Sequence, residues 1–164
     1  MDHFLGYTLK MLLLLLLANG TPVLAKRFLG RHWSAPLDAG KVFFDSQPIL
    51  GASKTWRGLL VGVIATALTA PFLGFTWQIG AFFGALSLIG DLISSFIKRR
   101  INIPTSSMAL GLDQIPEAAL PLWILREQLN LDLWSIIIVV ILFIIGELIL
   151  SKLLFKARIR DKPY

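Results

Sequence analysis

The chain has 164 residues, of which 55% are hydrophobic and 16% are charged, and its mean hydropathy is +0.72. A soluble domain of this size has too much surface to cover with so few charges, so the composition predicts an integral membrane protein. The absence of cysteine excludes disulfides and thiolate metal sites. His3 and His32 lie far apart in the sequence, which argues against a zinc centre built on imidazoles.

Five apolar segments have roughly the length that an α-helix needs to cross a bilayer, about 20 residues. The first contains the leucine run 12–17, the fourth is short and interrupted, and the last includes the continuous apolar stretch 136–145. The predicted spans are 4–25, 57–74, 77–97, 113–129 and 133–155. We therefore expect an all-α integral membrane protein with five transmembrane helices, forming a single transmembrane domain over residues 1–164.

The net charge of +6 is concentrated beside the apolar segments, so we expect it to mark membrane topology and predict no nucleic-acid partner. Basic residues gather in three regions: Lys26, Arg27, Arg31, Lys41, Lys54 and Arg57; Lys98, Arg99 and Arg100; and Lys156, Arg158, Arg160 and Lys162. With five spans, all three basic regions fall on the same side of the membrane. The prediction is a multi-pass plasma-membrane protein with its N-terminus outside, its C-terminus cytoplasmic, and a long cytoplasmic loop between the first two helices.

The first segment also imitates a secretory signal peptide, with Lys10, a leucine run and small residues near Ala25. The segment before the leucine run is barely positive. Cleavage after Ala25 would also leave the basic pair at 26–27 outside the cell. A membrane span is the preferred interpretation.

The third segment carries ionisable and hydroxyl side chains at membrane depth. Asp91, Ser94, Ser95 and Lys98 are spaced at i, i+3, i+4 and i+7, which places them on one face of a helix. Ionisable residues inside a membrane span are costly and usually functional. The alternative is that Asp91 forms an ion pair that only fixes helix packing.

The fourth segment opens with Asp113, Gln114 and Glu117 and carries Pro121 in its interior. Asp113 and Glu117 are four residues apart, so they share a helical face. Pro121 removes a helical hydrogen bond and should kink the segment, and broken spans that carry polar groups tend to line cavities. The alternative for Asp113 is a simple helix N-cap.

Asp91 and Asp113 therefore lie on different helices near the predicted cytoplasmic boundary. Carboxylates without histidine or cysteine suit a hard cation such as Mg²⁺, which prefers oxygen ligands and bound phosphates. Lys54 lies in a Gly-Ala-Ser-Lys-Thr turn that is not a P-loop, and we expect it to meet phosphate. Asn19 and Pro22 interrupt the first span, and Asn19 either makes an interhelical hydrogen bond or contacts substrate.

These motifs together resemble a known family. Segments 90–100 and 112–117 resemble the signature of CTP-dependent phosphatidate cytidylyltransferases, and more closely that of their small archaeal relatives, the CDP-archaeol synthases. Segments 38–45 and 51–58 look like that family's cytoplasmic loop, and the resemblance covers about residues 15–125. The chain is much shorter than the bacterial enzymes and lacks their His-Gly-Gly run, which favours the archaeal type.

The resemblance implies a reaction in which CTP and 2,3-bis-O-geranylgeranylglycerol 1-phosphate, a prenylated glycerol phosphate lipid, give CDP-archaeol and pyrophosphate with Mg²⁺. The lipid phosphate would attack the CTP α-phosphate in line. Asp91 and Asp113 would hold the metal and, with Lys98, form the catalytic group. The implied CTP-binding residues are Lys54, Thr55, Arg57, Lys98, Arg99, Asp38, Asn19 and Ser94. The residues implied either to bind substrate or to support the site are Arg100, Gln114 and Glu117.

Two other function classes compete with this prediction. A small transporter or ion-conducting protein could use Asp91 and Lys98 as a relay, but this would not explain the Lys54 turn. A CDP-alcohol phosphotransferase would need an Asp-Gly-x-x-Ala-Arg motif that the sequence lacks. The sequence leaves open the acceptor's exact structure, the number of metal ions, the groups that read cytosine and the oligomeric state.

Overall fold

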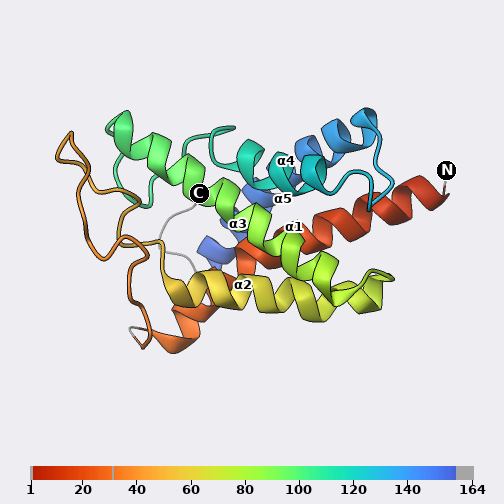
Figure 1. Ribbon diagram of the computed structural model, residues 1–164, viewed down its shortest axis with the longest axis horizontal. Helices are drawn as coiled ribbons and strands as arrows, with labels where there is room; N and C mark the ends of the chain where they lie inside the picture. Colours follow the sequence, from red (N-terminus) through yellow and green to blue (C-terminus); the bar gives the residue numbers. More distant parts are fainter. Residues whose placement is uncertain (1, 31, 158–164) are drawn as a thin grey trace.

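The computed structural model describes residues 2–30 and 32–157, and within them the fold is built from helices (Figure 1). The elements are α1 (Asp2–Leu29), α2 (Trp56–Thr69), the 3₁₀ helix η1 (Ala70–Leu73), α3 (Trp77–Arg100), α4 (Gln114–Ile124) and α5 (Leu133–Lys156). Extended pairing in the described part is limited to two isolated bridges, Pro36 with Thr55 and Val42 with Pro48. The all-α prediction is confirmed for the part of the chain that the structure describes.

Four helical segments are long and apolar enough to cross a membrane in the described residues: Leu5–Leu29, Trp56–Leu73, Trp77–Arg100 and Leu133–Lys156. These match four of the five predicted spans closely. In the predicted fourth span, α4 has only 11 residues. At 1.5 Å per residue it is about 16 Å long, roughly half the thickness of a bilayer core. The prediction of five full spans is therefore confirmed for four helices, and the remaining one is short.

Pro22 lies inside α1 without ending it. Proline has no N–H to donate, so the carbonyl oxygen of Ala18, four residues earlier, loses its helical partner. That oxygen faces Gly62 of α2, where an added Cβ atom would lie 2.7 Å from it. The missing side chain at Gly62 thus lets α1 and α2 approach closely at the level of the proline.

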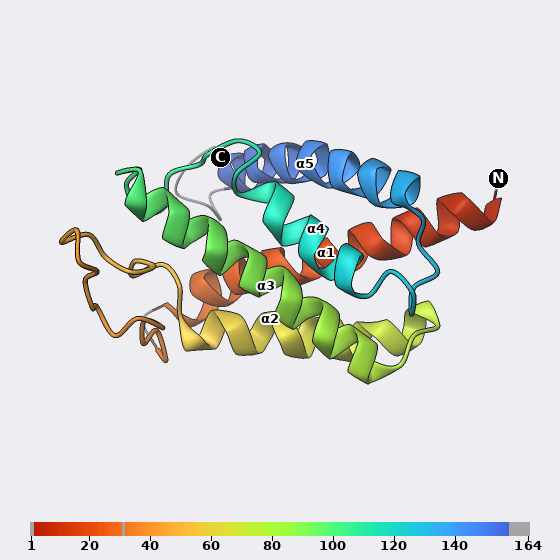
Figure 2. The same ribbon diagram turned by 45° about the horizontal axis from the view of Figure 1, so that its top comes forward.

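Helix α3 lies between α2 and α4 (Figure 2), and glycines make both contacts close. A Cβ atom added to Gly80 would lie 2.5 Å from the carbonyl oxygen of Thr66 in α2. On the side toward α4, a Cβ atom at Gly90 would lie 2.2 Å from the carbonyl oxygen of Pro116. Helices in lipid associate through such close packing, because the surrounding chains are as apolar as the side chains.

The apolar core fills the end of the bundle away from the long loop. Its members come from the first half of α1, α3 and α5 and from the last part of α4 and the turn after it. The largest fully buried apolar side chains are Phe83, Phe143, Met11, Leu14, Leu15, Leu122, Leu129 and Val139. Outward faces stay apolar as well, such as Ile137, Ile141 and Ile145 of α5, as expected for surfaces that meet lipid chains.

We predict that Gly80→Val destabilises the protein by about 1–3 kcal/mol, because the new side chain must push against the backbone of α2. The measurement is thermal unfolding in detergent. Gly6→Val in α1 is the matched control, since a Cβ atom there meets nothing within 4 Å. Equal melting temperatures for the two variants would contradict the packing described above.

Candidate active site

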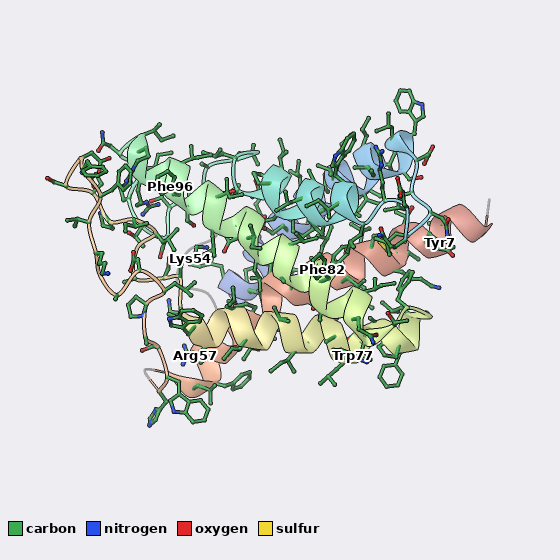
Figure 3. The ribbon with its side chains drawn as sticks, viewed as in Figure 1. Tyr7, Lys54, Arg57, Trp77, Phe82 and Phe96 are labelled. Atoms are coloured by element: carbon green, nitrogen blue, oxygen red, sulfur yellow. The ribbon has the colours of Figure 1, made fainter. Side chains whose placement is uncertain are left out.

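A cavity of about 710 Å³ lies at the end of the bundle that carries the long loop, and all five α-helices contribute to its wall. Figure 3 shows Lys54 and Arg57 at this end, whereas Tyr7 and Trp77 lie at the opposite end. The ionisable side chains on the described wall are six cations and four carboxylates. They are Lys26, Arg27, Lys54, Arg57, Lys98, Arg99, Asp91, Asp113, Glu117 and Glu147.

Asp91 is held by an ion pair that comes from the loop and not from its own helix. The Nζ atom of Lys54 donates to Oδ2 of Asp91 at 2.5 Å. Burial alone would lower the pKa of Lys54, but the carboxylate of Asp91, together with those of Glu117 and Asp113, raises that pKa above its ordinary value. Lys54 therefore stays charged and joins the loop to the middle of α3.

Asp113 forms the second ion pair of the cavity. Its Oδ1 lies 2.6 Å from Nζ of Lys98, and its Oδ2 accepts the N–H of Ala109 at 2.8 Å. Asp113 precedes α4, yet its side chain does not cap that helix. The N-cap alternative is therefore wrong for this side chain, which closes the preceding turn and binds the end of α3. Lys98 thus pairs with Asp113, while Asp91 pairs with Lys54.

Two further polar side chains of α4 are buried beside these pairs. Glu117 interacts with Asp91, and its Oε2 has no hydrogen-bond partner among the described residues. Gln114 accepts the N–H of Gly111 at 2.8 Å and so shapes the turn that precedes α4. The close approach of Gly90 to α4 is what places Asp91 beside Glu117.

Among described residues, no group of three or more acidic or histidine side chains could hold a metal.

The loop that carries Lys54 is organised around Asp38. Both carboxylate oxygens accept backbone N–H groups, Oδ1 from Gly40 at 3.0 Å and Oδ2 from Leu50 at 3.0 Å and Gly51 at 2.8 Å. Burial opposes ionisation, but these three donors outweigh it and lower the pKa of Asp38 below its ordinary value. Asp38 does not line the cavity. The structure places this predicted CTP contact in the interior of the loop.

Arg57 and Thr55 line the cavity while they fasten the start of α2. Nη1 of Arg57 donates to the carbonyl oxygens of Gly30 at 3.1 Å and His32 at 2.5 Å, which fixes the end of α1. The hydroxyl oxygen of Thr55 accepts the N–H of Gly58 at 3.2 Å and caps α2. Both residues therefore line the cavity and also make hydrogen bonds with the backbone.

The adjacent arginines at the end of α3 have different positions. Arg99 lines the cavity and is only 3% exposed, and its Nε and Nη1 have no hydrogen-bond partner in the described part of the chain. Because unpaired buried donors are costly, these two nitrogen atoms are available to donate to a bound anion. Arg100 lies outside the cavity wall.

Arg100 instead holds the tip of the loop against α3. Its guanidinium lies 4.8 Å from the rings of both Phe43 and Phe96, the latter marked in Figure 3. Its Nε is 3.1 Å from Oδ2 of Asp45, and its Nη2 donates to the carbonyl oxygen of Pro48 at 2.6 Å. Arg100, which was predicted either to bind substrate or to support the site, thus joins the end of α3 to the loop.

Asn19 makes the interhelical hydrogen bond that was one of its two predicted roles. Its Nδ2 donates to Oγ of Ser87 in α3 at 3.0 Å, and it also lines the cavity. Ser94 is buried between α3 and the start of α4, where its hydroxyl donates to the carbonyl oxygen of Gly90 at 2.9 Å. Ser94 is absent from the cavity wall, and Ser95 is on it.

Sequence reasoning assigned no site role to Lys26, Arg27 or Glu147, all of which line the cavity. The basic pair was interpreted only as a topology marker, but α1 continues to Leu29 and carries the pair along the cavity. Glu147 is the one carboxylate within the 24 residues of α5. A single ionisable residue in an apolar span is usually functional, so this pattern could have identified Glu147 as a site residue. Arg31, Arg158, Arg160 and Lys162 lie outside the described residues.

One known protein family matches almost the whole chain. The CarS-like family, described as CDP-archaeol synthase, matches residues 4–80 and 71–164. The chain belongs to the CDP-archaeol synthase family. A CDP-archaeol synthase of Pyrobaculum calidifontis is 33% identical over 152 residues, which is 90% of each chain. One from Sulfurisphaera tokodaii is 28% identical over 155 residues, covering 91% of this chain and 90% of the relative.

A solved structure has the same fold as this CDP-archaeol synthase family member. It is described as "Structural insight into an intramembrane enzyme for archaeal membrane lipids biosynthesis". The TM-score is 0.74 at 25% sequence identity, over 87% of this chain and 90% of that one. The resemblance found in the sequence is confirmed, and the relatives are named as synthases, so the transporter alternative loses its support.

We predict that Asp38→Asn loosens the loop, because an amide offers one acceptor oxygen where three backbone N–H groups need acceptors. Leaving a donor unsatisfied costs about 1–3 kcal/mol. Since the folded-state pKa of Asp38 is lowered, its stabilisation is present above the ordinary value of 3.8 and is lost as pH falls through the lowered value.

The measurement is the rate of loop cleavage by proteinase K at neutral pH, which should rise in Asp38→Asn. Lys41→Gln changes an exposed charge in the same loop and is the matched control. Equal cleavage rates for both variants and the wild type would show that Asp38 does not organise the loop.

Proposed function

We propose that this protein transfers CMP from CTP to a prenylated glycerol phosphate and releases CDP-archaeol and pyrophosphate. The observation that carries the proposal is the large cavity at one end of the membrane helices, whose described wall carries six cations and four carboxylates, Asp91 and Asp113 among them. Such a site suits a polyphosphate and a hard cation, and the family membership of the chain names the matching reaction class.

The cations on the cavity wall are the proposed seat of the CTP triphosphate. Arg99 offers two buried nitrogen atoms that have no acceptor in the described residues. Lys54 and Lys98 lie against Asp91 and Asp113, and a bound triphosphate gives each ammonium group a second anionic partner. Thr55, Arg57 and Asn19 complete the proposed contacts on the wall, with Ser94, Gln114 and Glu117 supporting them from α3 and α4.

The same wall is the proposed seat of a divalent cation. Asp91 and Asp113 each present carboxylate oxygens close to a lysine ammonium group, which supports a place for positive charge at both positions. Mg²⁺ needs only one or two carboxylates when phosphates and water complete its shell. When bound, Mg²⁺ neutralises the triphosphate and the charge that builds on the leaving pyrophosphate.

The chemistry needs no general base. The acceptor's phosphomonoester has a second pKa near 6 and is already largely ionised at neutral pH. One of its oxygens attacks the α-phosphorus of CTP in line, a new P–O bond forms, and the bond to the β-phosphate oxygen breaks. The electron pair leaves with pyrophosphate. Lys54, Lys98 and Arg99 stabilise the developing charge, so positioning and electrostatics supply the catalysis.

The proposed function also implies how the chain crosses the membrane. The chain passes the membrane five times, with the segment that contains α4 as the short fourth passage. The cationic end with the long loop faces the cytoplasm, as the positive-inside rule requires, and the N-terminus lies outside. CTP then reaches the cavity from water at the plasma membrane, while the acceptor's chains remain in the bilayer.

We predict that Asp91→Asn lowers CTP-dependent pyrophosphate release by at least about 100-fold, because it removes a proposed metal ligand and leaves Lys54 without its carboxylate. The assay uses purified protein in detergent with CTP and the prenylated glycerol phosphate, with Mg²⁺ or a chelator. Wild-type release should need lipid, CTP and Mg²⁺ together.

The control is Glu127→Gln, which removes an exposed carboxylate outside the cavity wall. This variant should retain wild-type activity. Size-exclusion chromatography must show that both variants remain folded. Wild-type activity in the presence of the chelator would refute the requirement for a metal ion. Absence of release by the wild type with any phosphatidate-like lipid would refute the proposed reaction.

We predict that Arg99→Gln raises the KM for CTP by about 10- to 100-fold, the loss expected for a hydrogen bond between charged groups. The KM for the acceptor should change little at saturating CTP. Arg126→Gln removes an exposed arginine away from the cavity and serves as the control. An unchanged KM for CTP in the Arg99 variant would show that Arg99 does not bind the triphosphate.

A further inference from the structure

The tip of the long loop, residues 42–48, turns apolar side chains outward. The N–H of Phe43 donates to the carbonyl oxygen of Gln47 at 2.8 Å and closes a tight turn. Within this turn Phe44 is 97% exposed, and Val42 beside it is 61% exposed. Neither residue lines the cavity, so the proposed reaction gives these exposed apolar side chains no role.

A row of aromatic rings joins the loop tip to α3. The ring centroid of Phe43 lies 5.5 Å from that of Phe96, and the centroid of Phe44 lies 5.0 Å from that of Phe43. Both pairs are edge-on, which is a favourable arrangement for aromatic rings. The row therefore begins on the helix at Phe96, passes through Phe43 and ends at the exposed ring of Phe44.

Phe96 belongs to the outward side of α3. Ile89 and Ile93 precede it by seven and three residues, and Ile97 follows Ile93 by four, so these side chains share one helical face. All three isoleucines are exposed, and α3 is long and apolar enough to cross a membrane. Exposed apolar side chains on such a helix meet lipid chains. The aromatic row of the tip thus continues a lipid-facing surface.

Phe96 also lies near the level at which the hydrocarbon layer ends. It comes 19 residues after Trp77, the first residue of α3, and Figure 3 shows the two side chains toward opposite ends of the helix. At 1.5 Å per residue this separation is about 28 Å, close to the thickness of a bilayer core, about 30 Å. Arg100 follows one turn later and holds the tip. The tip therefore lies where acyl chains give way to headgroups.

We propose that the loop tip is an interfacial anchor, which inserts Phe44 and Val42 into the leaflet beside α3. Exposed apolar clusters mark interaction sites, and the adjoining lipid-facing side of α3 identifies lipid as the partner. The apolar side chains meet the ends of the acyl chains, while the guanidinium of Arg100 lies at the level of the headgroup phosphates, which favour a cation. The inference goes beyond the proposed function, because it does not depend on the reaction.

The test measures whether the tip lies in lipid. Since the chain has no cysteine, Ser46→Cys can carry a single fluorescent label at an exposed position of the turn while Phe44 stays in place. The full chain is placed, one copy each, in nanodiscs of phosphatidylcholine and phosphatidylglycerol. Lipids with a nitroxide near the headgroup should quench this label, and Phe44→Ser should reduce that quenching by about twofold or more.

A label at Lys41→Cys is the matched control, because residue 41 is exposed in the same loop but lies outside the tip. Lipid nitroxides should quench it less than the label at residue 46, and Phe44→Ser should not change its signal. Phe44 is 97% exposed, so its removal leaves the packing within the chain nearly unchanged. Val42→Ser removes the second apolar side chain and should cause a loss of quenching at residue 46 in the same direction.

Three outcomes would overturn the anchor. The first is equal lipid quenching at residue 46 with and without Phe44. The second is quenching by aqueous iodide that is as strong at residue 46 as at residue 41, because the tip would then lie in water. The third is a label at residue 46 that is shielded from iodide but not quenched by lipid nitroxides, because the tip would then contact protein.

Discussion

The close contact of α3 with its two neighbours is the constraint on which the site depends. Lipid gives helices no hydrophobic reason to associate, so glycines that allow backbone approach must supply the packing. Gly80 permits the contact with α2, and Gly90 permits the contact with α4. Because Gly90 is next to Asp91, the residue that allows helix packing also sets the distance between the acidic groups of α3 and α4. Stability and the geometry of the cavity therefore come from the same contact.

Charge balance is the second constraint, and it explains why the cavity can exist at the end of an apolar bundle. Buried charges need partners, and the pairs Lys54–Asp91 and Lys98–Asp113 supply them between the loop, α3 and the turn before α4. The loop itself is fastened at three points: inside by Asp38, at α1 by Arg57, and at its tip by Arg100. The fastened loop delivers Lys54 into the cavity.

The proposed reaction fits the geometry of the cavity, which has the size for a nucleotide triphosphate and carries six cations on its wall. These cations would hold the nucleotide in place while the acceptor's phosphate approaches it. A phosphate attacking another phosphate needs this kind of positioning more than it needs an acid or a base.

The sequence alone determined the membrane class, the ends of four spans to within four residues, and the face that joins Asp91 to Lys98, because spanning length and helical periodicity are local properties. Its motifs also identified the family. Only the tertiary structure decided that Lys98 pairs with Asp113 and that Lys26, Arg27 and Glu147 line the cavity. It also decided that Arg100 holds the loop against α3 and that Asp38 accepts backbone N–H groups inside the loop. Each of these depends on which distant segments meet, and spacing along one helix carries no information about the partner that packs against it.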